Sequence, residues 1–220
     1  MGRYRTKTIA EWNQMISGVQ PNSIFFVEGD DFGSMAIQFG ALGIDAVPDV
    51  MKNFTANHAG DYLTDGKTFE ADGEKLAWHM LNDYKSKYLS GDVRLAFFSP
   101  KVTLWSPYCP ALEMKACAEY CGDNYNVWEN FWFGVGDFFR LLPPLRPIID
   151  AIPNPAYRAN SVVCSQLAIL CYKYITSLYN AVLCGQDVSK VQPEELMRRI
   201  FSGFDFNFET EQQVVTATVI

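Results

Sequence analysis

The chain has 220 residues, of which 49% are hydrophobic and 15% aromatic, so it can bury the core of one sizeable domain. Its formal net charge of -7 argues against nucleic acid or an anionic membrane as a partner, because both are bound through clustered Lys and Arg. No secretory signal and no transmembrane span is visible. We therefore expect a cytoplasmic protein or one carried in a virion.

Six cysteines without an export signal are expected to be reduced thiols. Cys117 and Cys121 lie four residues apart on an expected helix, and together with Cys109 they could contribute to a metal site. No nearby histidine and no further CxxC pair completes a set of four ligands. Burial in the core is the favoured interpretation, and we expect no metal and no cofactor.

The first third of the chain predicts a short helix followed by strands. Residues 8–18 form an amphipathic pattern that Pro21 ends, and residues 23–27 are a compact apolar run bounded by turn residues. Residues 34–43 could form a short helix. Residues 54–63 read as a strand, and 67–71 as the strand that returns after a turn at residues 64–66.

The register of this hairpin decides where Glu70 points. A two-residue loop over Asp65 and Gly66 would pair Asp61 with Glu70 and turn Glu70 away from His58. A three-residue loop, with a type I turn over residues 64–65 and a left-handed Gly66, would pair Gly60 with Glu70. Glu70 and His58 would then share one face as diagonal neighbours, with backbones roughly 7 to 8 Å apart.

The remaining segments alternate between helices, one strand and an apolar insertion. The patterns predict helices over residues 76–88, 111–121, 160–183 and 193–201, and a strand over 93–98. Residues 127–155 are rich in Trp, Phe, Leu and Pro and resemble a hydrophobic flap or wall. We expect an α+β fold: a single domain over 1–205 with an aromatic, Pro-rich insertion at about 127–155, and a C-terminal tail over 206–220 that forms an arm or a strand.

Cys164 lies in the first turn of the long predicted helix, where Asn160 or Ser161 could be the N-cap. The helix start favours a thiolate, and a thiolate needs a general base. His79 falls in a polar predicted helix and reads as a surface residue, whereas His58 has a turn-linked carboxylate available. A Cys, His and carboxylate set is the papain-type arrangement. The residues alone nevertheless favour a buried core thiol at Cys164.

A resemblance to a known family changes this balance. Five motifs resemble, in family order, those of the circularly permuted NlpC/P60 superfamily of papain-like cysteine hydrolases, and they extend from Pro21 to about Tyr174. They are Pro21-Asn22-Ser23-Ile24-Phe25-Phe26-Val27, Asn57-His58-Ala59-Gly60, the hairpin from Asp65-Gly66 to Glu70-Ala71, Gly122-Asp123-Asn124-Tyr125-Asn126, and Val163-Cys164-Ser165-Gln166. The resemblance implies a papain-like antiparallel sheet packed against helices.

The resemblance also implies roles for three residues. Cys164 would be the nucleophile, His58 the general base and Glu70 the orienting third group, which favours the bacterial or phage-like branch over the related lecithin:retinol acyltransferase-like branch. The expected activity is that of a thiol protease or amidase acting on peptidoglycan peptides. Tyr62 and Tyr125 are candidates for lining the cleft, with Tyr62 near the oxyanion, and packing is the alternative for both.

Departures from the family pattern leave other functions open. Asn22-Ser23 replaces the usual Gly-Asp pair, Asn126 stands where Asp is typical, and the aromatic segment is longer than expected. That segment would suit a lipidic acyl group, which makes a lipid ester or amide hydrolase, or an acyltransferase, the second enzymatic hypothesis. A structural or binding module, such as a phage-particle component that docks a protein partner through the aromatic segment or the tail, is the third.

Overall fold

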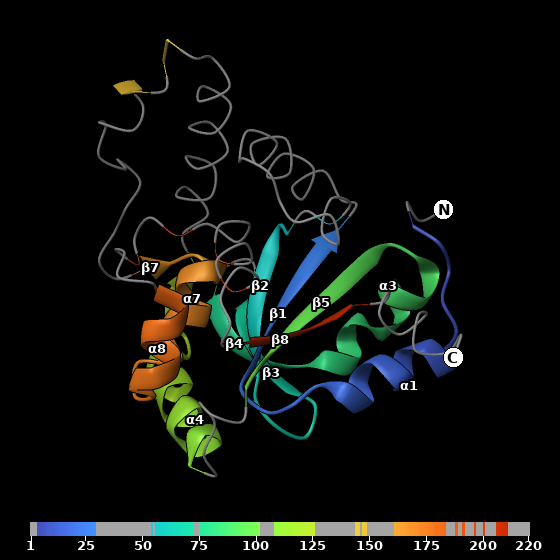
Figure 1. Cartoon of the computed structure of the whole chain (residues 1–220), viewed down its shortest axis with the longest axis horizontal. Coiled ribbons are helices and arrows are strands. Elements are labelled where there is room, and N and C mark those ends of the chain that lie inside the picture. The colour runs from blue at the N-terminus through green and yellow to red at the C-terminus, as the bar shows by residue number, and fades with distance from the viewer. Residues whose placement is uncertain are drawn as a thin grey trace.

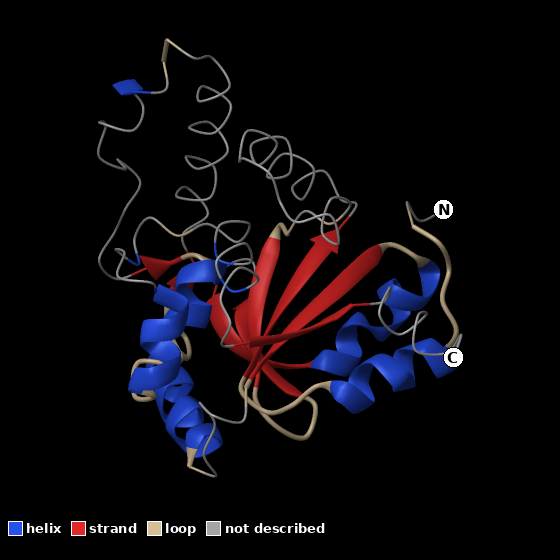
Figure 2. Ribbon diagram, in the orientation of Figure 1, coloured by secondary structure: helices blue, strands red, loops and turns tan. Residues whose placement is uncertain are grey.

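A computed structural model of the protein describes residues 4–29, 54, 56–72, 75–101, 108–125, 144–145, 147–148, 161–183, 188, 191, 196, 200 and 206–210. The chain has an α+β fold built on one sheet (Figures 1 and 2). The strands are β1 (Ser23–Gly29), β2 (His58–Tyr62), β3 (Lys67–Asp72), β4 (Lys75–Met80), β5 (Val93–Pro100), β6 (Asn124–Tyr125), β7 (Ser161–Val162) and β8 (Phe206–Thr210). The helices are α1 (Ile9–Gly18), the 3-10 turn η2 (Leu81–Tyr84), α3 (Lys85–Ser90), α4 (Cys109–Tyr120), α7 (Cys164–Leu170) and α8 (Thr176–Leu183).

The sheet has eight strands in the order β7-β6-β4-β3-β2-β1-β5-β8. All neighbouring strands are antiparallel except β6 and β7, which are parallel. β1 is central and pairs with β2 on one side and β5 on the other. Every residue of β1 is buried, because helices cover both faces of the sheet.

Helices lie on both faces of the sheet (Figure 2), and each face carries its own core. On one face, Ile24 and Phe26 of β1 pack with Ala168 and Ile169 of α7 and with further side chains from the α8 region. Residues of the opposite parity point the other way, and their cluster joins the sheet to α1, η2 and α3: Phe25, Val27, Tyr62, Leu95 and Phe97 with Trp12, Met15, Leu81 and Tyr88. The sheet is therefore the middle layer of three.

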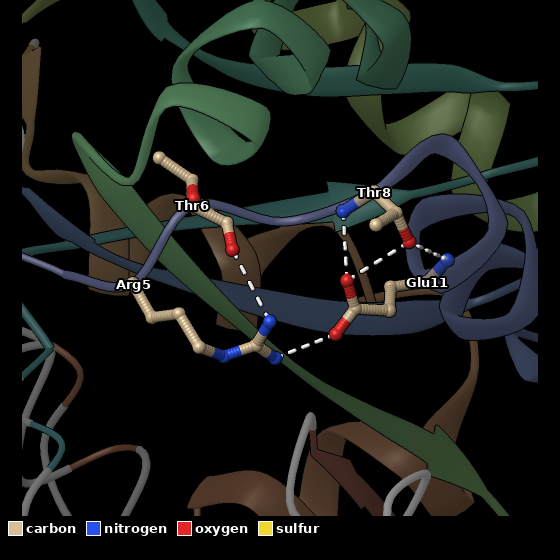
Figure 3. A network of polar contacts seen from close by, with 4 residues as sticks. All are labelled: Arg5, Thr6, Thr8 and Glu11. Carbon is tan, nitrogen blue, oxygen red and sulfur yellow. Dashed lines mark hydrogen bonds and ion pairs between the residues drawn. The ribbon is translucent and has the colours of Figure 1, made fainter.

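A complete capping box starts α1 (Figure 3). The backbone N–H of Glu11 donates to Thr8 Oγ1 at 3.2 Å, and the backbone N–H of Thr8 donates to Glu11 Oε2 at 2.7 Å. Arg5 Nη2 lies 2.5 Å from Glu11 Oε1. The hydrogen bond from Arg5 is the main reason that the pKa of Glu11 falls to about 2. The helix predicted over residues 8–18 is confirmed as α1, and Thr8 is its N-cap.

The helix predicted over residues 76–88 is wrong. Residues 75–80 form strand β4, which pairs along its whole length with β3, and η2 and α3 follow it. The apolar residues that suggested one helical face diverge: Leu76 is buried, whereas Met80 is 43% exposed. Their spacing fits a period of two as well as a period of 3.6, and pairing with β3 decides between the two.

The single helix predicted over residues 160–183 is also wrong. α7 ends at Leu170, a tight turn follows, and α8 begins at Thr176. In the turn, the backbone N–H groups of Tyr172, Lys173 and Ile175 donate to carbonyls three residues earlier. The Tyr172 hydroxyl donates to the buried Asn22 carbonyl at 2.5 Å. This tertiary anchor and the burial of Ile175 favour a break that the local sequence does not indicate.

The start of the expected tail lies within the sheet. Residues 206–210 form β8, which pairs with β5 from Ala96↔Thr210 to Pro100↔Phe206. The predicted insertion at 127–155 and the short helix expected at 34–43 lie outside the described residues, apart from 144–145 and 147–148. None of the helices in the described part of the chain combines the length and the apolar character needed to cross a bilayer.

Candidate active site

His58 is the first residue of β2 and lies opposite Val27 of β1. The strand pairing with β1 fixes its backbone, and the N–H of the preceding Asn57 donates to the Val27 carbonyl at 3.0 Å. The His58 side chain keeps 21% of its surface exposed. His58 is thus held at the end of a central strand with part of its ring accessible.

The β2–β3 hairpin has the register that brings Glu70 to His58. Asp61 pairs with Phe69 and Tyr62 with Thr68, so Gly60 lies opposite Glu70. The turn differs from the predicted one: Asp65 and Gly66 both have positive φ, 53° and 78°, and the Lys67 N–H donates to the Thr64 carbonyl. The Lys67 carbonyl also accepts the Leu63 N–H. Leu63 and Thr64 therefore both face Lys67, which makes a bulge of one extra residue on the β2 side. This bulge gives the same strand pairing as the three-residue loop would.

Three side chains donate hydrogen bonds to Glu70. His58 Nε2 lies 2.9 Å from Oε2, Thr68 Oγ1 donates to Oε1 at 2.9 Å, and the Tyr84 hydroxyl donates to Oε2. Burial alone would raise the pKa of Glu70, but the hydrogen bonds from His58, Tyr84 and Thr68 outweigh it and hold that pKa below its usual value. Glu70 is therefore a buried, ionised partner for the ring.

Cys164 reaches the same place through the short strands at the sheet edge. β6 pairs with β4 through Lys75↔Asn124 and with β7 through Tyr125↔Val162. Cys164, two residues after Val162, is the first residue of α7 and is fully buried. The parallel pairing of β6 with β7 thus places Tyr125 and Cys164 next to each other and close to His58.

The sulfur of Cys164 is hydrogen-bonded to the His58 ring, the backbone of Ala59 and the side chain of Tyr125. Because Nε2 of His58 faces Glu70, Nδ1 is the nitrogen left for the thiol. Burial alone would raise the pKa of Cys164 and lower that of His58, but their mutual hydrogen bond reverses both effects. The pKa of Cys164 falls below its usual value, and that of His58 rises to about 10. These directions favour a thiolate beside an imidazolium.

The two residues after Cys164 have structural roles. Gln166 Oε1 accepts the Val163 N–H at 3.3 Å, and Ser165 Oγ donates to the Val191 carbonyl at 2.6 Å. The N-cap is Val163 rather than Asn160 or Ser161: Ser161 is in β7, and Asn160 lies outside the described residues. Cys164 is the first helical residue, as part of a helix of only seven residues.

Tyr84 and Tyr125 contact the site residues. Tyr62 is 9% exposed and packs in the cluster beneath α1 and α3, in line with the packing alternative. Tyr125, the other tyrosine proposed to line the cleft, hydrogen-bonds the Cys164 sulfur. The role of Tyr84 was missed because the sequence placed it on the inner face of a predicted helix. Only the strand β4 and the turn η2 bring it back over the sheet.

His79 lies on β4 opposite Thr68, rather than on the surface of a helix. Cys109 and Cys117 are buried and Cys121 is exposed. Within the described ranges, no three His, Cys, Asp or Glu side chains are grouped so that they could hold a metal ion. The residues predicted as the triad, Cys164, His58 and Glu70, are those that the structure brings together.

A second buried polar cluster lies on the α4 and α7 side of the sheet. Asp61 and Glu113 are both fully buried, and Glu113 accepts a hydrogen bond from Asn22 Nδ2. The sulfurs of Cys117 and Cys171 lie 3.2 Å apart. Burial raises the pKa of Asp61 and of Glu113 well above the usual range. The raised pKa values favour the neutral, protonated form of these two buried carboxyl groups.

No protein-family model matches the chain, and no curated protein matches its sequence.

Proposed function

We propose that the protein is a thiol hydrolase of the papain-like type, with Cys164 as nucleophile, His58 as general acid and base, and Glu70 as orienting carboxylate. The observation that carries the proposal is the bonding of His58 on both sides: Nε2 lies 2.9 Å from Glu70 Oε2, and the ring bonds the Cys164 sulfur. A histidine held in this way can move a proton between the sulfur and a substrate.

The reaction follows from this pairing. The Cys164 thiolate attacks an amide or ester carbonyl carbon, and His58 gives its proton to the leaving nitrogen or oxygen as the bond to carbon breaks. Water then attacks the thioester, His58 takes the proton of that water, and the carboxylic acid leaves as the thiolate is restored. Glu70 stays ionised and stabilises the imidazolium that each cycle requires.

The substrate class rests on the resemblance of the sequence motifs to those of permuted NlpC/P60 hydrolases, and the structure adds only the coarse α+β class. An amide bond in peptidoglycan peptides is the proposed target. Because Cys164 is fully buried and 21% of the His58 side chain is exposed, a substrate has to reach the sulfur from the ring side and displace a neighbouring group.

The test measures the ionisation and the reactivity of Cys164 separately. Thiolate absorbance near 240 nm, followed against pH, should show a thiolate that titrates below the ordinary cysteine range, and Cys164→Ser should abolish that step. Iodoacetamide should then label Cys164 faster than the exposed Cys121, and His58→Ala should remove this advantage. A thiolate step that persists in Cys164→Ser would contradict the assignment. Muropeptide and acyl-ester panels then identify the scissile bond.

A further inference from the structure

Tyr84 contacts the same carboxylate oxygen as the proposed general base. Its hydroxyl donates to Glu70 Oε2, the atom that also lies 2.9 Å from His58 Nε2. The other oxygen, Oε1, is held by Thr68 from the same strand at 2.9 Å. Tyr84 comes from a separate element, η2, which follows β4. The carboxylate is therefore fixed from two elements, and only Tyr84 shares an oxygen with the ring.

The packing of Tyr84 leaves its hydroxyl little choice of position. Its ring meets the buried Phe25 ring edge-on, with centroids 5.8 Å apart, and borders the core beneath α1 and α3. Phe25 in turn lies against Gly60, the residue opposite Glu70. Burial and the neighbouring Glu70 raise the pKa of Tyr84 above its usual value. The phenol is thus a neutral donor at every pH at which the enzyme would work.

We propose that Tyr84 is a positioning residue of the thiol hydrolase, whose hydroxyl keeps the Glu70 carboxylate turned toward the His58 ring. The inference rests on the proposed function. The Glu70 carboxylate is joined to the strand backbone through three rotatable bonds, and loss of one donor frees it to turn away from the ring. Without the phenol, Glu70 Oε2 is away from His58 Nε2 for part of the time, and during that time the imidazolium has no adjacent negative charge.

The loss of the Tyr84 hydroxyl can be measured in the titration of both His58 and Cys164. In Tyr84→Phe, the pKa of His58 should fall, so its imidazolium form is less stable and stabilises the Cys164 thiolate less. The pH at which Cys164 alkylation begins to rise should therefore increase by about one unit. We expect kcat to fall about tenfold with KM within twofold, as for an interaction that acts on the chemical step.

Two matched variants separate positioning from packing. Tyr88→Phe removes a hydroxyl from a buried tyrosine of the same core cluster and should leave both pKa values unchanged. Thr68→Val removes the donor to Oε1 alone and should shift them less than Tyr84→Phe does. Because the chain has two histidines, a His79→Gln variant assigns the His58 imidazole signals in a nitrogen-15 titration.

The possible results are distinct. A fall in the His58 pKa that is larger in Tyr84→Phe than in Thr68→Val, and absent in Tyr88→Phe, supports the proposal. An unchanged pKa overturns it. A rise also overturns it, since Tyr84 would then only withdraw charge from a carboxylate that stays in place. If Cys164 of the unmodified protein shows no lowered titration, the proposed function fails, while the His58 titration still decides whether Tyr84 positions Glu70.

Discussion

Gly60 lies opposite Glu70 across the β2–β3 ladder, and its lack of a side chain makes room for the carboxylate and for Phe25. A Cβ at position 60 would lie 2.7 Å from Phe25 Cε1, closer than Cβ atoms approach in proteins, and 3.0 Å from Glu70 Cβ, which is a tight contact. Phe25 is fully buried, so its ring cannot move into solvent. Gly60, which the three-residue loop would pair with Glu70, thus sets the space beside the Glu70 side chain.

Gly60→Ala should therefore lower both stability and reactivity. We expect a loss of about 1–3 kcal/mol in the free energy of unfolding, typical of overpacking in a core, and slower alkylation of Cys164 because Glu70 is pushed from His58. Urea unfolding and iodoacetamide kinetics measure the two effects. Adding Phe25→Leu should relieve the clash and recover part of the stability. An unchanged midpoint in Gly60→Ala would contradict the close packing.

Glu70→Gln should weaken the thiolate–imidazolium pair without removing the hydrogen-bonding shape. The neutral amide no longer stabilises an imidazolium, so the pKa of His58 should fall from about 10 and that of Cys164 should rise. The thiolate window, which lies between the lowered pKa of Cys164 and the raised pKa of His58, should narrow from both ends. Alkylation rate against pH tests this, and a window of unchanged width would exclude Glu70 as the orienting group.

Tyr125→Phe and Tyr62→Phe form a matched pair. The side chain of Tyr125 hydrogen-bonds the Cys164 sulfur and lowers its pKa, so its loss should raise the pKa of Cys164 and slow alkylation severalfold below neutral pH. Tyr62 packs in the opposite core, and its variant should alkylate like the unmodified protein. Equal effects of the two substitutions would show that Tyr125 acts through packing alone.

The buried carboxyl of Asp61 predicts a stability that declines as pH rises. Its folded-state pKa is raised well above the ordinary value of 3.8, so the folded chain holds a proton that the unfolded chain has lost. The stability that this difference contributes is full below the unfolded pKa and is lost as pH rises through the folded one. Asp61→Asn should flatten the slope of unfolding free energy between pH 5 and 8, and stabilise by about 1–3 kcal/mol at the upper end.

Urea unfolding at several pH values measures this slope in the unmodified and variant proteins. The difference between the two reports on Asp61 together with its effect on Glu113, because the Asp61 charge is one cause of the raised pKa of Glu113. Parallel curves would mean that Asp61 is not held protonated in the fold. Glu113→Gln provides a second case, since burial raises the pKa of Glu113 too.

The local sequence pattern was sufficient to predict a helix or strand where a single pattern fits the segment. The amphipathic pattern over residues 8–18 forms helix α1, and the compact run at residues 23–27 is the central strand. The local pattern was insufficient where two periods fit the same residues. Leu76, Met80 and Tyr84 suit a helical face, but residues 75–80 satisfy their backbone groups against β3 instead. The break between α7 and α8 likewise depends on Tyr172 reaching Asn22, 150 positions away in the chain.

The sequence by itself determined the candidates: two histidines, a cysteine after a β-branched pair, and a carboxylate linked to His58 by a short turn. Those choices follow from residue chemistry and from motif order. Only the tertiary structure decided that Glu70 faces the His58 ring, since Leu63 and Thr64 shift the register by one residue, and that Tyr84 and Tyr125 complete the site. Such contacts depend on strand pairing between distant segments, which local propensity does not encode.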